Sequence, residues 1–167
     1  KFAFRTLKSQ ASQYVNFTNR LPVVLNYVPK DDEKKIYELT EKYLNLAEKQ
    51  AYPQMDNYQL TLMFYHILAS SPQAFASMLN APIERTHGNE RVILESMRDM
   101  AVKITQTAKM EEFLKAIRTI FAHLRGRKET QKAIVFVDNL ATVPVLADML
   151  TTAGCSVIKH TEKEALS

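Results

Sequence analysis

Positive charge gathers in one short stretch of the sequence, just before a run of apolar residues. Arg125, Arg127, Lys128 and Lys132 all lie within residues 125–132. Lysine and arginine side chains bind phosphate oxygens and release counterions, so contacts of this kind weaken as salt rises. The same residues also suit a solvated turn between two elements, which is the more common role of a short charge cluster. The stretch therefore indicates either a phosphate-binding surface or a solvated turn, and the turn is favoured.

Other reactive residue types do not form a recognisable catalytic or metal site. The four histidines are scattered along the chain: His66, His87, His123 and His160. They form no His-x-x-x-His pair and have no cysteine nearby, so a zinc ion would lack ligands. Ser70 and Ser71 stand without an arranged base, and such a serine is a poor nucleophile near neutral pH. We expect no catalytic residue, no cofactor site and no metal site.

Acidic pairs occur at two expected helix starts: Asp31, Asp32, Glu111 and Glu112. Carboxylates at these positions stabilise the positive end of a helix. No pair is flanked by the apolar surroundings that would raise a carboxylate pKa for acid–base catalysis. We therefore expect them to act as helix caps.

Composition limits the kinds of protein that this chain can be. It has 167 residues, of which 46% are apolar, and this suffices for one or two compact units. The net charge of +4 permits contact with a polyanion without requiring it. Three glycines are too few for a phosphate-binding loop, and one cysteine, Cys155, excludes an intrachain disulfide and fits a reducing compartment.

The ends of the chain and its apolar runs bear on targeting. No apolar run approaches the roughly 20 residues that a membrane-spanning helix needs. The chain begins at Lys1 without a charged and then apolar leader, so we expect no secretory signal. We also expect that the natural start precedes Lys1.

Helical periodicity dominates the middle of the sequence. Apolar residues recur at helical spacing in five stretches: 31–50, 57–68, 72–79, 89–104 and 110–124. Asp31 and Asp32 are expected to cap the first helix, and Asp56 or Asn57 the second. Ser71 is a predicted N-cap with Pro72 at the first helical position. Pro82 is expected to end the third helix, and Gly126 the last one.

Three segments have the composition of β-strands. Residues 20–28 are rich in β-branched side chains, 133–137 are continuously apolar, and 155–160 form a third such run. Between the last two, Thr142 is expected to cap a helix that Gly154 ends. The order predicts a β-α-β unit with two parallel strands.

Two parallel strands are too few to be stable alone, so residues 20–28 are expected to add a third. Even so, a sheet of this size would be incomplete. The predicted fold class is mainly α with a small C-terminal α/β portion.

Three stretches resemble one family of proteins. "FRTLKSQASQYVNFTNRLPVVLNYVPKDDEKKIYELTEKYLNL" is similar to the exit from the first motor lobe of Swi/Snf-type superfamily-two helicases. "YQLTLMFYHILASSPQAFASML" resembles the segment that bacterial members carry between their lobes. "KAIVFVDNLATVPVLADMLTTAGCSVIKH" looks like the opening of the second RecA-like lobe. "LASSPQAF" is the most informative piece.

The resemblance implies an organisation and an activity. Residues 1–30 would be an extended lead-in with one strand, 31–125 a helical segment between lobes, and 126–167 the beginning of a RecA-like C-terminal lobe. The parent would be a cytoplasmic, bacterial ATP-dependent helicase or translocase, using ATP and Mg²⁺ and binding nucleic acid, most naturally DNA. Its phosphate-binding loop would precede Lys1 and its arginine finger would follow Ser167. This chain would contact the remaining motor lobes, bind no membrane and have no ATPase activity of its own.

The resemblance also implies sites near the start of the last helix. In such motors this region lies near the nucleic-acid backbone, which here indicates Asn139 and Thr142, with Asp138 beside them. Plain capping of the turn is the favoured alternative, and the carboxylate of Asp138 would repel a phosphate. Two other functions remain open: a standalone helical protein-interaction module, and a helical nucleic-acid-binding domain without ATPase activity.

Overall fold

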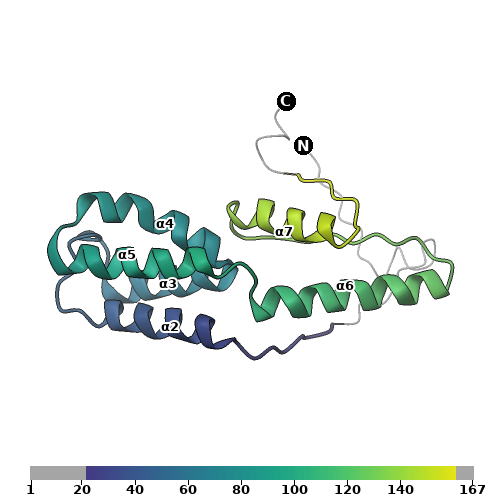
Figure 1. Cartoon of the computed structure of the whole chain (residues 1–167), viewed down its shortest axis with the longest axis horizontal. Helices are drawn as coiled ribbons and strands as arrows, with labels where there is room; N and C mark the ends of the chain where they lie inside the picture. The colour runs from purple at the N-terminus through teal and green to yellow at the C-terminus, as the bar shows by residue number, and fades with distance from the viewer. Residues whose placement is uncertain (1–21, 161–167) are drawn as a thin grey trace, which may run out of the picture.

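The computed structural model describes residues 22–160, and these residues form six helices. The helices are α2 (Asp31–Leu44), α3 (Asn57–Ser70), α4 (Pro72–Arg85), α5 (Gly88–Lys103), α6 (Ala108–Gly126) and α7 (Thr142–Thr152). Figure 1 shows α2 to α5 gathered into a bundle, from which α6 extends away. Helix α7 packs against α4. Within residues 22–160, no helix is both long and apolar enough to cross a membrane.

The connected hydrophobic core lies between α2, α3, α4 and α5 and includes Ala51 and Ile104 from the adjoining loops. Helix α4 packs against both α3 and α5, while α2 packs against α5 and α3. Phe64 is fully buried at the centre, with its ring centroid 5.4 Å from Tyr43 and 5.5 Å from Phe75. The connected core runs from Ile36 to Ile104 and contains no residue of α6 or α7. Burial of apolar surface therefore holds together the bundle, and the few buried apolar residues of α6 and α7, such as Met110 and Ala147, lie outside this connected core.

The starts of α3 and α4 follow the sequence prediction. Asp56 accepts a hydrogen bond from the backbone N–H of Gln59 at 2.8 Å, which confirms it as the N-cap of α3. Ser71 accepts one from Ala74 at 3.0 Å, with Pro72 as the first helical residue. Both side chains satisfy backbone donors that have no partner within the helix.

The start of α2 differs from the prediction. Its N-cap is Lys30, and the carboxylate of Glu33 accepts the Lys30 backbone N–H at 2.9 Å. Asp31 and Asp32 are residues of the first turn, where their charge complements the helix dipole, and Asp32 Oδ1 accepts the backbone N–H of Glu33 at 2.9 Å, which agrees with part of the capping prediction. Glu33 takes the capping role because its longer side chain reaches back over that turn.

The expectation that Pro82 ends its helix is wrong. Helix α4 continues to Arg85, and Pro82 is buried inside it. A proline in a helix interior removes one backbone hydrogen bond and costs about 3 kcal/mol. Leu79 and Ile83 on either side are buried in the core, and their burial offsets this cost.

The predicted strands are absent from the described residues. Residues 133–137 and 155–160 have no regular secondary structure, and neither do residues 22–28 of the first predicted strand, whose residues 20 and 21 lie outside the described range. Ile134, Phe136 and Ile158 are 83%, 91% and 94% exposed. The described residues thus show the helix of the predicted β-α-β unit and not its strands, because a strand needs a hydrogen-bonded neighbour and residues 22–160 supply none.

The helix of that unit ends as predicted. Gly154, with a φ of 86°, follows α7 in the left-handed conformation that favours glycine. Its backbone N–H donates to Thr151, and Cys155 donates to Leu150 at 2.9 Å. These bonds satisfy carbonyls of the last turn, so α7 forms without the flanking strands.

Alkaline pH is expected to destabilise the bundle through Tyr43. Burial and a hydrogen bond to Glu90 raise the pKa of Tyr43 well above its ordinary value near 10. Above pH 10 the unfolded chain loses this proton and the folded one keeps it, so the free energy of unfolding falls by up to about 1.4 kcal/mol per pH unit. Urea unfolding between pH 8 and 11.5 measures this.

The Tyr43→Phe variant is the matched control for that experiment. The variant lacks the ionisable hydroxyl of residue 43 and keeps the other tyrosines. Its free energy of unfolding is therefore expected to fall less steeply as the pH rises. Equal slopes for the two proteins would show that Tyr43 does not cause the effect.

Candidate nucleic-acid interface

The basic residues singled out in the sequence surround the C-terminal end of α6. Arg125 lies in the last turn, Arg127 is the C-cap, and Lys128 follows with a φ of 58°. All three side chains are exposed. Because Lys128 is in the left-handed conformation, the backbone N–H of Glu129 donates to the carbonyl of Leu124 at 2.9 Å. This bond closes the end of α6. Gly126 is the last helical residue, as expected, but the chain reverses at Lys128.

Two of these cations already have side-chain partners. Arg125 Nη2 donates to Gln131 Oε1 at 3.2 Å, and Arg127 Nε is 3.0 Å from Glu129 Oε1. Both contacts are exposed, and exposed ion pairs are weak and easily exchanged for a stronger anion. A phosphate could therefore compete with Glu129 for Arg127. The cluster is open to an anionic ligand.

Asn139 has a local role before α7. Its Oδ1 accepts a hydrogen bond from the backbone N–H of Ala141 at 2.9 Å. This arrangement holds the turn that leads into the helix. The amide is half-buried, so part of it remains accessible.

Thr142 occupies a different position from the one expected. It is the first residue of α7 and not the N-cap, which is Ala141. The residue is 2% exposed, and its Oγ1 lies 2.9 Å from Ser70 Oγ and 2.8 Å from Ser71 Oγ. The hydroxyl is therefore engaged with the junction of α3 and α4. Any contact between Thr142 and a phosphate would require this cluster to open.

The candidates fall into two separate groups. Arg125, Arg127 and Lys128 lie at the end of α6, whereas Asn139 and Thr142 lie at the start of α7. Within the part of the chain that the structure describes, no hydrogen bond or ion pair joins the two groups.

Asp138 lies beside the second group. Its carboxylate is exposed and 4.0 Å from Nε2 of His66 on α3. The negative charge makes the approach to α7 less favourable for a phosphate than the end of α6. The basic cluster is the better candidate surface.

Sequence reasoning missed a buried carboxylate in the bundle. Glu90 is 8% exposed and accepts three hydrogen bonds: from the Tyr43 hydroxyl at 2.9 Å and from the backbone N–H groups of Gln50 and Ala51 at 2.7 and 3.1 Å. It ties the α2–α3 loop to the start of α5. Glu90 is the third residue of α5, a position typical of an acid that caps a helix start, and the sequence shows this. Its hydrogen-bond partners were not predictable, because they are distant in sequence.

Two hollows lie beside the start of α6. The larger, of about 460 Å³, is lined by residues 26–28, Lys30, Ala108, Glu111 and Glu112. A cavity of about 20 Å³ lies among α2, α3 and the start of α6, and it has room for about one water. Within residues 22–160, no group of three or more His, Cys, Asp or Glu side chains is placed to hold a metal ion. Comparison with known proteins finds no matching family model, no matching curated protein and no matching solved structure.

Proposed function

We propose that this chain is a non-catalytic middle segment of an ATP-dependent nucleic-acid helicase or translocase, and that it links the two motor lobes. In this proposal the parent is a bacterial, cytoplasmic DNA-binding enzyme that binds ATP and Mg²⁺ outside these residues. The chain contributes a helical bundle, an attached pair of helices and phosphate contacts from Arg125, Arg127 and Lys128. Asn139 and Thr142 are secondary contact candidates.

The observation that carries the proposal is the exposure of apolar segments on both sides of α7. Ile134, Phe136 and Ile158 are almost fully exposed in segments without regular secondary structure. Exposed apolar runs of strand composition are unfavourable in water and available for pairing with further strands. In the proposed parent protein, such strands would belong to the rest of the second RecA-like lobe, which this part of the chain resembles.

A helical protein-interaction module is the second candidate function. The observation in its favour is the self-contained core of α2 to α5, which includes neither α6 nor α7. Such a bundle needs no motor lobe to fold. Reading the gene around this segment separates the two candidates. A Gly-Lys-Thr loop encoded upstream in the same frame supports the motor, and a gene that encodes only these residues supports the module.

Binding of the chain to labelled duplex DNA tests the phosphate contacts. We expect the logarithm of the binding constant to fall with the logarithm of salt concentration between 50 and 200 mM, with a slope near −3. About three cations would each release roughly 0.9 counterion. Replacing Arg125, Arg127 and Lys128 together with alanine is expected to remove most of this slope. Fluorescence anisotropy measures both.

The matched control replaces three other exposed cations with alanine: Lys35, Lys42 and Lys103. It lowers the net charge by the same amount, so a general charge effect would change both variants equally. A flat salt dependence in the unaltered chain would exclude phosphate contacts. Equal losses in the two triple variants would exclude the end of α6 as their location.

A further inference from the structure

Helix α6 is attached to the bundle through polar contacts, and Ala108, Met110 and Ile117 of this helix are also buried. No residue of α6 belongs to the connected hydrophobic core, although the helix has an apolar stripe of its own, and Ile120 on that stripe is 49% exposed. Helix α6 is also not among the helices that pack closely with α2, α3, α4 or α5. Interfaces between bodies that are polar and small allow relative motion.

The polar contacts form a seam, defined by Lys30, Glu33, Ala108, Lys109 and Glu111. Glu33 Oε2 accepts the backbone N–H of Ala108 at 3.0 Å, and Lys30 Nζ donates to Glu111 Oε1 at 2.6 Å. Lys109 Nζ donates to the carbonyl of Ala69 at the end of α3, 2.9 Å away. Each bond joins the first turn of α6 to another part of the chain. Water and salt compete with such contacts more effectively than with apolar packing.

The connection between α5 and α6 supplies a pivot. Ile104 is 2% exposed, and its carbonyl accepts a hydrogen bond from Gln73 Nε2 at 2.8 Å. Thr105 and Gln106 follow and are exposed. The carbonyl of Gln106 is held by Lys30 Nζ at 3.0 Å. A short exposed stretch between two buried residues, Ile104 and Thr107, is suited to absorb a change of backbone angles.

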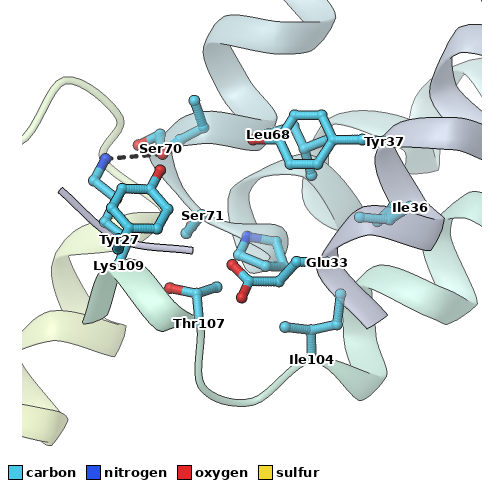
Figure 2. A pocket seen from close by; sticks show the side chains of 12 residues that line it. Tyr27, Glu33, Ile36, Tyr37, Leu68, Ser70, Ser71, Ile104, Thr107 and Lys109 are labelled. Atoms are coloured by element: carbon cyan, nitrogen blue, oxygen red, sulfur yellow. Dashed lines mark hydrogen bonds between the residues drawn. The ribbon is translucent and has the colours of Figure 1, made fainter. Parts of the chain in front are cut away.

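A small cavity lies against the seam. Figure 2 shows Glu33, Ser71 and Thr107 around it, and Lys109 bonded at its edge. Its volume of about 20 Å³ accommodates about one water molecule. A water molecule in this cavity can take the place of a seam hydrogen bond when that bond breaks. The buried carboxylate of Glu33 then keeps a hydrogen-bond partner when the seam opens.

We propose that α6 is a lever that reorients about Thr105 and Gln106, and that the seam is the latch that holds it in the orientation described here. The ion pair of Lys30 and Glu111 makes the latch sensitive to salt. The inference rests on the described helices alone, so it stands or falls separately from the proposed motor.

Distance measurements between spin labels test the lever. Labels go on Val92→Cys in α5 and Arg118→Cys in α6, both exposed, with Cys155→Ser to remove the native thiol. At low salt we expect one dominant distance. Lys30→Met, or 1 M salt without that substitution, is expected to raise a second distance population roughly 2- to 5-fold, because either change removes the latch pair.

The matched control is Lys34→Met, which breaks an exposed pair with Asp31 inside α2. It should leave the distances unchanged, and all variants should keep the same helix content by circular dichroism. If Lys30→Met leaves the distribution of label distances unchanged, the latch is overturned, whatever the effect of 1 M salt. An equal change in Lys34→Met overturns it as well.

Discussion

The Phe64→Ala variant is expected to lose about 4 kcal/mol of the free energy of unfolding. Phe64 is fully buried between Tyr43, Tyr52 and Phe75, with ring centroids 5.4 to 5.5 Å away. Removal of the ring loses its transfer free energy and leaves a cavity that the rigid helices cannot fill, which together cost about 3–5 kcal/mol. Urea unfolding monitored by circular dichroism measures the loss. If the variant does not fold, Phe64→Leu is expected to lose roughly 1–2 kcal/mol, because most of the volume remains.

Phe136→Ala is the matched control, since it removes the same ring from an exposed site. Phe136 is 91% exposed in the stretch that the sequence predicted to be a buried strand. Its replacement is expected to change the free energy of unfolding by less than about 0.5 kcal/mol. A loss comparable to that of Phe64→Ala would show that residues 133–137 are buried in solution, and would contradict the structure.

Removal of the buried carboxylate of Glu90 is expected to cost about 3 kcal/mol. In Glu90→Ala, the backbone N–H groups of Gln50 and Ala51 and the hydroxyl of Tyr43 lose their acceptor. Each buried donor left without a partner costs roughly 1–3 kcal/mol, reduced where water can enter. Urea unfolding gives the change, and faster amide exchange is expected at Gln50 and Ala51. An exchange rate unaffected by the substitution would contradict the assigned hydrogen bonds.

Two further variants separate the hydrogen bonds of Glu90 from general effects on α5. Glu95→Ala breaks an exposed pair with Arg91 in the same helix and is expected to cost less than about 1 kcal/mol. Tyr43→Phe removes one of the three donors, for a loss of about 1 kcal/mol. The double variant with Glu90→Ala is expected to be less destabilised than the sum, because both changes remove the same bond.

The starts of α3 and α4 were predictable because the capping side chain and its backbone partner are close in sequence, although the equally local caps Glu33 and Thr107 were missed. Asp56 and Ser71 each bond a backbone N–H three residues ahead, so the pattern contains both partners. Pro82 was misjudged because its tolerance depends on burial between α3 and α5, which involves residues distant in sequence. The contact of Glu33 with Ala108 and the contacts of Glu90 were missed for the same reason.

The strand predictions had a different weakness. The composition of residues 133–137 indicates a preference for extended backbone, and the structure has no regular secondary structure there. A strand also requires a neighbour to accept and donate its hydrogen bonds, and composition does not show whether one is present.

The candidate site was predictable only in part. The sequence located the cations of residues 125–132, and their exposure at the end of α6 agrees with either a phosphate surface or a solvated turn. Burial of Thr142 against Ser70 and Ser71 could not be anticipated, since more than 70 residues separate the partners.

The sequence alone determined the helical character of the chain, most helix ends and the position of its positive charge, because these depend on neighbours within about four residues. Only the tertiary structure decided which apolar residues are buried and which carboxylates are enclosed. It also decided that α6 is joined to the bundle through polar contacts. These properties depend on pairs of residues far apart in sequence, whose proximity follows from packing of the whole chain.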